Sequence, residues 1–199
     1  MAGPLERLAS RALDLSGCAY LAIAALICFD IVARRVLGFS TEATVELSGY
    51  LMGVGMTWGL AGTLYERGHV RIDVLLQKLP LRVRVWFHLA SLAALLASVG
   101  FFAWGACRLA KDSYELGATD LSTLHIPMAW PQGLWAAGFV LMLLAVLAIL
   151  ARSAARLLAG DADGMDRMLM ARTYVEETAE TLEAVAQAQP GPQTGSPRE

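Results

Sequence analysis

The chain has 199 residues, of which 56% are hydrophobic and only 17% are charged, and its formal net charge is −2. The charges are clustered, so several long windows hold none. This pattern excludes a soluble four-helix bundle, because each helix of such a bundle would carry a polar stripe along one face. We expect neither a nucleic-acid partner nor a cofactor.

Four windows are apolar enough to cross a bilayer as helices. A membrane helix needs about 20 apolar residues to cross about 30 Å of hydrocarbon. The sequence therefore predicts an all-α integral membrane protein with four transmembrane helices. The windows are 15–33, which has Asp30 near its end, and 47–65, 85–107 and 130–151, which hold no charged residue apart from the neutral His88.

The first window closes with Asp30 and Arg34, which lie four residues apart and can pair on one helix face. A carboxylate is least costly near the end of a span, so we expect a structural ion pair there rather than a ligand site.

Acidic and glycine residues mark the second window. Glu46 lies just before it, and we expect this carboxylate at the outer membrane boundary, paired with an arginine. Within the window, Gly55, Gly59 and Gly62 share a helix face, and the Gly-x-x-x-Gly spacing of the first two lets helix backbones approach closely. This span is expected to be the most deeply buried.

The segment 66–80 is too charged to span the membrane but is not uniformly polar. Ile72, Leu75, Leu76 and Leu79 fall on one face of a short helix. This spacing predicts a short amphipathic helix lying in the membrane interface between the second and third spans. An ordinary basic loop with incidental leucines is the alternative.

Prolines mark the starts of the last two spans. The third span is expected to begin after Pro80, with His88 as an interfacial side chain. Pro127 and Pro131 suit the start of the fourth, because proline is tolerated in a first helical turn. Trp130 lies where an aromatic belt meets the lipid headgroups.

Residues 1–156 are therefore expected to form the membrane domain, and 157–199 a cytoplasmic tail. Asp161 to Gly164 reads as a break, 165–188 can form an amphipathic helix, and the last ten residues are typical of disorder.

The distribution of basic residues orients the chain. With four spans, both termini and the central loop share one side, which the positive-inside rule places in the cytoplasm. That side holds Arg7, Arg11, Arg67, Arg71, Lys78, Arg82, Arg84, Arg152, Arg156, Arg167, Arg172 and Arg198, and the other holds Arg34, Arg35, Arg108 and Lys111.

The chemistry available to the chain is limited. The three cysteines have no metal-ligand spacing, and the three histidines lie in or near loops rather than in facing pairs that could bind haem. Enzymatic activity is therefore not expected, and a membrane subunit that works with a partner is favoured. Two alternatives remain: a small self-contained exporter, and a membrane anchor subunit of another inner-membrane complex.

Five short motifs occur in order along residues 10 to 155, and together they resemble the small membrane subunit of tripartite ATP-independent periplasmic (TRAP) transporters, the DctQ-like family. They are Asp30-Ile-Val-Ala-Arg34, Glu46-Leu-Ser, His69-Val-Arg-Ile-Asp73, Leu79-Pro80 and Ile126-Pro127-Met-Ala-Trp130-Pro131. The chain lacks the tryptophan that the family often has shortly before the position of Glu46.

The resemblance implies a multi-pass protein of the bacterial inner membrane. It would scaffold a large membrane subunit, which carries the sodium and substrate sites, while a periplasmic substrate-binding protein delivers an organic acid for symport. Membrane lipids are further expected partners. The residues expected at subunit interfaces or as anchors are Arg34, Arg35, Glu46, Gly55, Gly59, His69, Arg71, Asp73, Pro127 and Trp130.

Overall fold

The protein is all-helical wherever the computed structural model describes it, namely in residues 3–39, 43–66, 79–122, 124–169, 178, 181, 182 and 185. The expected all-α class is confirmed. The elements are α1 (Pro4–Val32), which continues into a π-helical turn, η1 (Ala33–Leu37), then α2 (Thr44–Tyr65), α4 (Leu81–Glu115), α5 (Ala129–Leu158) and α6 (Ala162–Leu169).

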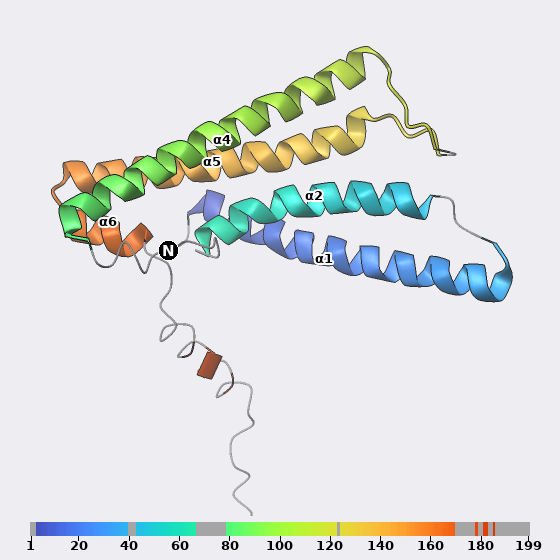
Figure 1. The fold of residues 1–199 in the computed structure, drawn as a ribbon, viewed down its shortest axis with the longest axis horizontal. Coiled ribbons are helices and arrows are strands. Elements are labelled where there is room, and N and C mark those ends of the chain that lie inside the picture. Colours follow the sequence, from blue (N-terminus) through green and yellow to red (C-terminus); the bar gives the residue numbers. More distant parts are fainter. Residues whose placement is uncertain are drawn as a thin grey trace, which may run out of the picture.

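The four long helices lie side by side in the order α1, α2, α5, α4 (Figure 1). α1 packs against α2, α2 against α5 and α5 against α4, so α1 and α4 are the outer helices of one layer. We call the end that holds the N-terminus and α6 the α6 end, and the opposite end, which holds the α4–α5 connection, the hairpin end (Figure 1).

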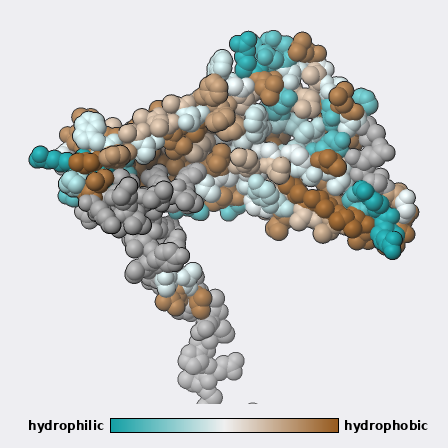
Figure 2. Space-filling model, in the orientation of Figure 1, coloured by the Kyte–Doolittle hydropathy of each residue, from teal (hydrophilic) through white to brown (hydrophobic). Residues whose placement is uncertain are grey.

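Apolar side chains cover much of the visible face of the layer, and hydrophilic residues gather mainly toward its ends (Figure 2). Three helical segments are long and apolar enough to cross a membrane: Pro4–Leu37, Leu81–Glu115 and Ala129–Leu158. α2 is not among them. Its 22 residues span about 33 Å, so length is sufficient, but its glycines and threonines dilute its apolar character. The fourth span therefore stays a prediction.

Local sequence determines where the helices begin and end. Pro80 has an extended backbone, and α4 begins at the next residue, as expected. α4 ends in a left-handed glycine, Gly117, where the Ala118 amide donates to the Ser113 carbonyl at 3.0 Å. The same motif ends α5, with Gly160 in the left-handed region and the Asp161 amide donating to the Arg156 carbonyl.

The glycine face of α2 packs against α1 of the same chain. The Ser16 hydroxyl of α1 donates to the Gly55 carbonyl at 2.5 Å. A Cβ atom on Gly59 would lie 3.0 Å from Ser16 Oγ, and one on Gly62 would lie 2.9 Å from the Ala9 carbonyl oxygen. The two backbones can approach this closely only because these positions have no side chain.

A second close seam joins α2 to α5. A Cβ atom on Gly138 would lie 2.8 Å from the carbonyl carbon of Thr57, so this position also admits only glycine without a shift. Nearby, Trp58 Nε1 donates to the Leu134 carbonyl at 2.8 Å. α2 is thus held on both sides.

The segment after α5 folds back onto the layer. Met165 and Leu169 of α6 are buried with Val85 and Leu92 of α4. Asp166 is 4% exposed and accepts a hydrogen bond from Arg84 Nε at 2.7 Å. α6 therefore covers the α6 end of α4 and α5 through both apolar and ionic contacts.

The break expected at Asp161 to Gly164 is wrong in its position, because α6 already begins at Ala162. Asp161 causes the shift: its Oδ1 accepts the Gly164 amide at 2.8 Å and so caps the helix. The predicted interfacial helix around Ile72 lies outside the described residues.

The α1–α2 seam predicts opposite effects for two glycine substitutions. Gly62→Ala would press a methyl group against Leu13 and the Ala9 carbonyl, so we expect a loss of about 1–3 kcal/mol in unfolding free energy. Gly49→Ala is the control, because a Cβ there meets open space, and it should be neutral or stabilise by up to about 1 kcal/mol. Thermal unfolding in detergent would test this, and equal effects would contradict the seam.

The α6 contact predicts that Asp166→Ala releases this helix. Removing the buried carboxylate leaves Arg84 without its ionic partner, at a cost of about 2–3 kcal/mol. Hydrogen exchange of the 162–169 backbone should become faster, whereas Asp112→Ala, which removes an exposed carboxylate at the other end of α4, should leave it nearly unchanged. Unchanged exchange in the Asp166 variant would show that apolar contacts alone hold α6.

Candidate interaction surfaces

The hairpin end is organised by Asp120. Its backbone amide donates to the Ile126 carbonyl at 2.9 Å, and the Met128 amide donates to the Ala118 carbonyl at 2.9 Å, so the two sides of the α4–α5 connection pair. Asp120 Oδ1 accepts the Ser122 amide at 2.9 Å, and Oδ2 accepts the Ser122 hydroxyl at 2.6 Å. These bonds close a local turn that holds the hairpin in shape.

The same carboxylate ties the hairpin to α2. The Tyr50 hydroxyl donates to Asp120 Oδ2 at 2.8 Å. Hydrogen bonds from the Ser122 hydroxyl, Tyr50 and the Ser122 amide hold the pKa of Asp120 below its usual value, because all of them favour the ionised form. Asp120 is therefore a charged acceptor around neutral pH.

Glu46 lies one turn before Tyr50 on α2 and is half-buried. Its Oε2 atom is buried and has no hydrogen-bond partner among the described residues, and the arginine expected beside it is not found there. A buried carboxylate oxygen without a donor is costly. A donor from another molecule would remove that cost.

At the far end of α1, Arg34 Nη2 contacts Asp30 Oδ2 at 2.7 Å, which confirms the expected pair. The Asp30 side chain is 7% exposed, while that of Arg34 is 65% exposed. Arg34 and Arg35 both lie in η1. The expected outer-surface residues Arg34, Arg35 and Glu46 therefore share the hairpin end, but they form no ion pair with one another within the described ranges.

Pro127 and Trp130 lie at the start of α5. Pro127 precedes the helix, and the Trp130 amide donates to its carbonyl at 3.2 Å. Trp130 is 73% exposed and lines an open hollow of about 510 Å³ together with Tyr114 and Gly117. An exposed aromatic pair at a helix end is typical of the membrane–water boundary.

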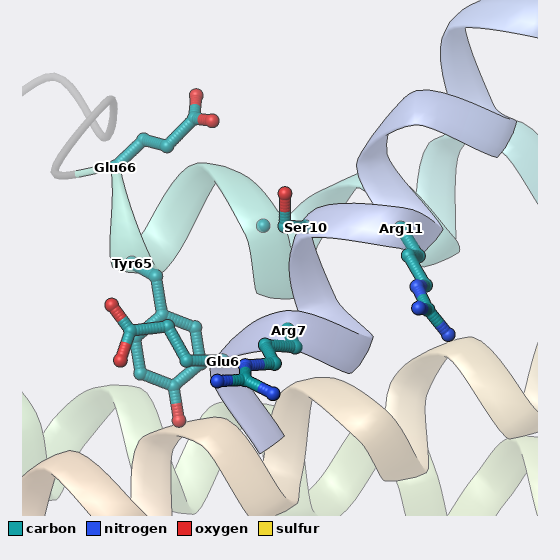
Figure 3. A pocket seen from close by; sticks show the side chains of 7 residues that line it. Glu6, Arg7, Ser10, Arg11, Tyr65 and Glu66 are labelled. Carbon is teal, nitrogen blue, oxygen red and sulfur yellow. The ribbon is translucent and has the colours of Figure 1, made fainter. Parts of the chain in front are cut away.

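A polar pocket of about 440 Å³ lies between α1 and α2 at the α6 end (Figure 3). The first turns of α1 contribute Glu6, Arg7, Ser10 and Arg11, and the end of α2 contributes Gly62, Tyr65 and Glu66. Acidic and basic groups are both present, so the pocket suits a polar group that carries charges of either sign.

Several positions named from the sequence lie apart from these groups. Gly55 and Gly59 line the α1–α2 seam, and His69, Arg71 and Asp73 lie outside the described residues.

Sequence reasoning missed the Tyr50–Asp120 bond, because 70 residues separate the two side chains. It also placed His88 in the interface, whereas its side chain is buried and Nε2 lies 3.3 Å from Asp166 Oδ1. The sequence did hold a signal for the turn in the α4–α5 connection, since an aspartate side chain commonly accepts a hydrogen bond from the backbone amide two residues later, as Asp120 does from Ser122.

A family model described as “Tripartite ATP-independent periplasmic transporters, DctQ component” matches residues 23–156. This range covers the last third of α1, all of η1, α2, α4 and the α4–α5 connection, and nearly all of α5, and it ends before α6. A search of curated proteins gives no match.

The lowered pKa of Asp120 predicts a pH-dependent hairpin. Since the folded-state pKa lies below the unfolded value of about 4, the bonds stabilise the hairpin fully above that value and are lost as pH falls through the lowered pKa. At neutral pH, amides in 116–128 should exchange more slowly in the wild type than in Asp120→Asn. The difference should vanish once Asp120 is protonated, and a difference independent of pH would contradict this account.

Proposed function

The chain belongs to the DctQ component family of tripartite ATP-independent periplasmic transporters, and we propose that it is the small permease subunit that scaffolds a large transport subunit. It is a multi-pass membrane protein and a transporter component, not an enzyme. The single observation that carries the proposal is the family match over 23–156, which takes in three of the four long helices of the layer almost entirely and the last third of α1.

We propose that α2 is the fourth span. It lies between α1 and α5, two helices that are apolar enough to cross the membrane, and it runs alongside both (Figure 1). Four spans would put the α6 end, with Arg7, Arg11 and Arg84, in the cytoplasm of a bacterium, by the positive-inside rule. The hairpin end would then face the periplasm.

The proposed reaction is sodium-coupled uptake of an organic acid, with both binding sites in the large subunit. The hydrogen bonds that carboxylates form between distant described segments lie at the two ends, through Asp120 at one and Asp166 at the other. Between them, the largest buried side chains include Leu92, Met142 and Val146. This distribution suits a chain that holds a partner in place.

The hairpin end is the proposed meeting place with the periplasmic substrate-binding protein and the outer end of the large subunit. Glu46 offers a buried carboxylate oxygen there and Arg35 an exposed guanidinium group, and Arg34, which is paired with Asp30, keeps 65% of its side chain exposed. At the opposite end, the mixed-charge pocket of Figure 3 suits lipid headgroups, and His69, Arg71 and Asp73 are the further anchors that we propose for this side.

Co-purification tests the proposal. The tagged chain is extracted from its native membrane in mild detergent, and bound proteins are identified by mass spectrometry. We expect a much larger polytopic protein, and we expect sodium-dependent uptake of an organic acid in vesicles only when the small chain, the large subunit and the binding protein are all present. Recovery of the chain alone, or with a redox enzyme, would overturn the proposal.

Glu46→Ala tests the role of the hairpin end within that complex. Removing a carboxylate that receives a partner's donor should cost about 1.5–3 kcal/mol of binding, or at least about tenfold in affinity. Glu115→Ala is the control, because this carboxylate lies at the same end but is 60% exposed and pairs with Lys111. Equal recovery of the large subunit with both variants would contradict an interface at Glu46.

A further inference from the structure

A shallow groove of about 800 Å³ lies between α1 and α2 and borders the seam described above, since Ser16, Gly55 and Gly59 of the seam also line it. Its floor is formed by small residues of both helices. Side chains on its rim are apolar or uncharged polar, with one acidic exception. Six of the lining residues carry the argument: Asp14, Gly17, Cys18, Gly55, Met56 and Gly59.

The acidic exception is Asp14, which lies one residue before the apolar stretch that starts at Leu15. Its side chain is exposed, and it forms no ion pair within the part of the chain that the structure describes. Arg11, three residues earlier, lines the separate pocket of Figure 3 instead. A carboxylate at the edge of hydrocarbon is stabilised by a cation, and the groove leaves room for one.

The floor of the groove admits a further helix. A Cβ atom on Gly17 would meet open space, so the α1 backbone is bare at this position. Small residues of this kind let another helix come close in a bilayer. α1 is also the least covered of the three clear spans: 11% of its most apolar window is buried, against 28% for α5.

We propose that this groove seats a membrane-spanning helix of the large transport subunit, and that a lysine or arginine of that helix pairs with Asp14. Charge complementarity favours this occupant over a lipid tail, which carries no cation, and over a second copy that meets the first groove to groove, which would set the two Asp14 carboxylates against each other. The inference rests on the proposed function, from which it takes its partner.

Filling the groove tests the steric part. Gly17→Leu places a side chain where the partner helix would lie, without touching the α1–α2 seam. We expect recovery of the large subunit to fall by about tenfold or more. Gly105→Leu is the matched control, because Gly105 lies on α4, the other outer helix, and a Cβ there also meets open space. Equal recovery with both variants overturns the groove as the docking site.

Charge reversal tests the ionic part. Asp14→Lys should lower recovery of the large subunit by about tenfold, because it sets like charges against each other, whereas Asp14→Glu should retain it. Recovery unchanged by Asp14→Lys overturns the pairing.

Crosslinking identifies the occupant. Cys18 is exposed on the groove, so a photoreactive maleimide attached there, with Cys28 and Cys107 replaced by serine, should form an adduct with the large subunit. The control keeps Cys107 on α4 as the only cysteine and should give little of this adduct. An adduct with a second copy or with lipid alone overturns the inference.

These outcomes separate the two proposals. If the wild-type chain recovers the large subunit but the adduct from Cys18 is missing, the groove is wrong and the scaffold function stands. If no large subunit is recovered with the wild type, the proposed function itself fails.

Discussion

Close packing of α2 against both neighbours is the constraint on which the layer depends. In a bilayer, apolar side chains gain little by leaving lipid for another helix, so association relies on close contact and interhelical hydrogen bonds. α2 supplies both: Gly62 and the partner glycine Gly138 remove side chains from the two seams, and the Gly55 carbonyl and Trp58 form interhelical bonds. The order α1, α2, α5, α4 follows from these two seams.

The same residues weaken α2 as an independent span. Five glycines within 44–65 allow close approach but remove the apolar side chains that would make the helix favourable in lipid by itself. Its place is therefore set by α1 and α5 more than by its own composition. A helix that needs its neighbours on both sides belongs in the middle of a layer, where α2 is found.

Much of this architecture was predictable because it is encoded locally. The apolar windows give the long helices, Pro80 gives the start of α4, and the four-residue spacing gives the Asp30–Arg34 pair. Contacts between residues that lie far apart in the sequence could not be predicted in this way. The Arg84–Asp166 contact joins positions 82 residues apart, and no periodic pattern in the sequence predicts such a pairing. The cap on α6 could have been predicted, because Gly160 suits the residue just after the end of α5 and Asp161 suits the N-cap of the next helix.

A single layer of helices encloses no central path, and this geometry bears on what the chain can do. A substrate path through a membrane needs helices on all sides of it, whereas α1 and α4 each leave a broad surface uncovered by other described elements. The layer is nevertheless braced at both ends, by the Tyr50–Asp120 bond at the hairpin and by α6 across α4 and α5. A braced layer resists bending and leaves its faces uncovered, which agrees with the proposed role of supporting another membrane protein. Such a shape favours a fixed support over a moving carrier.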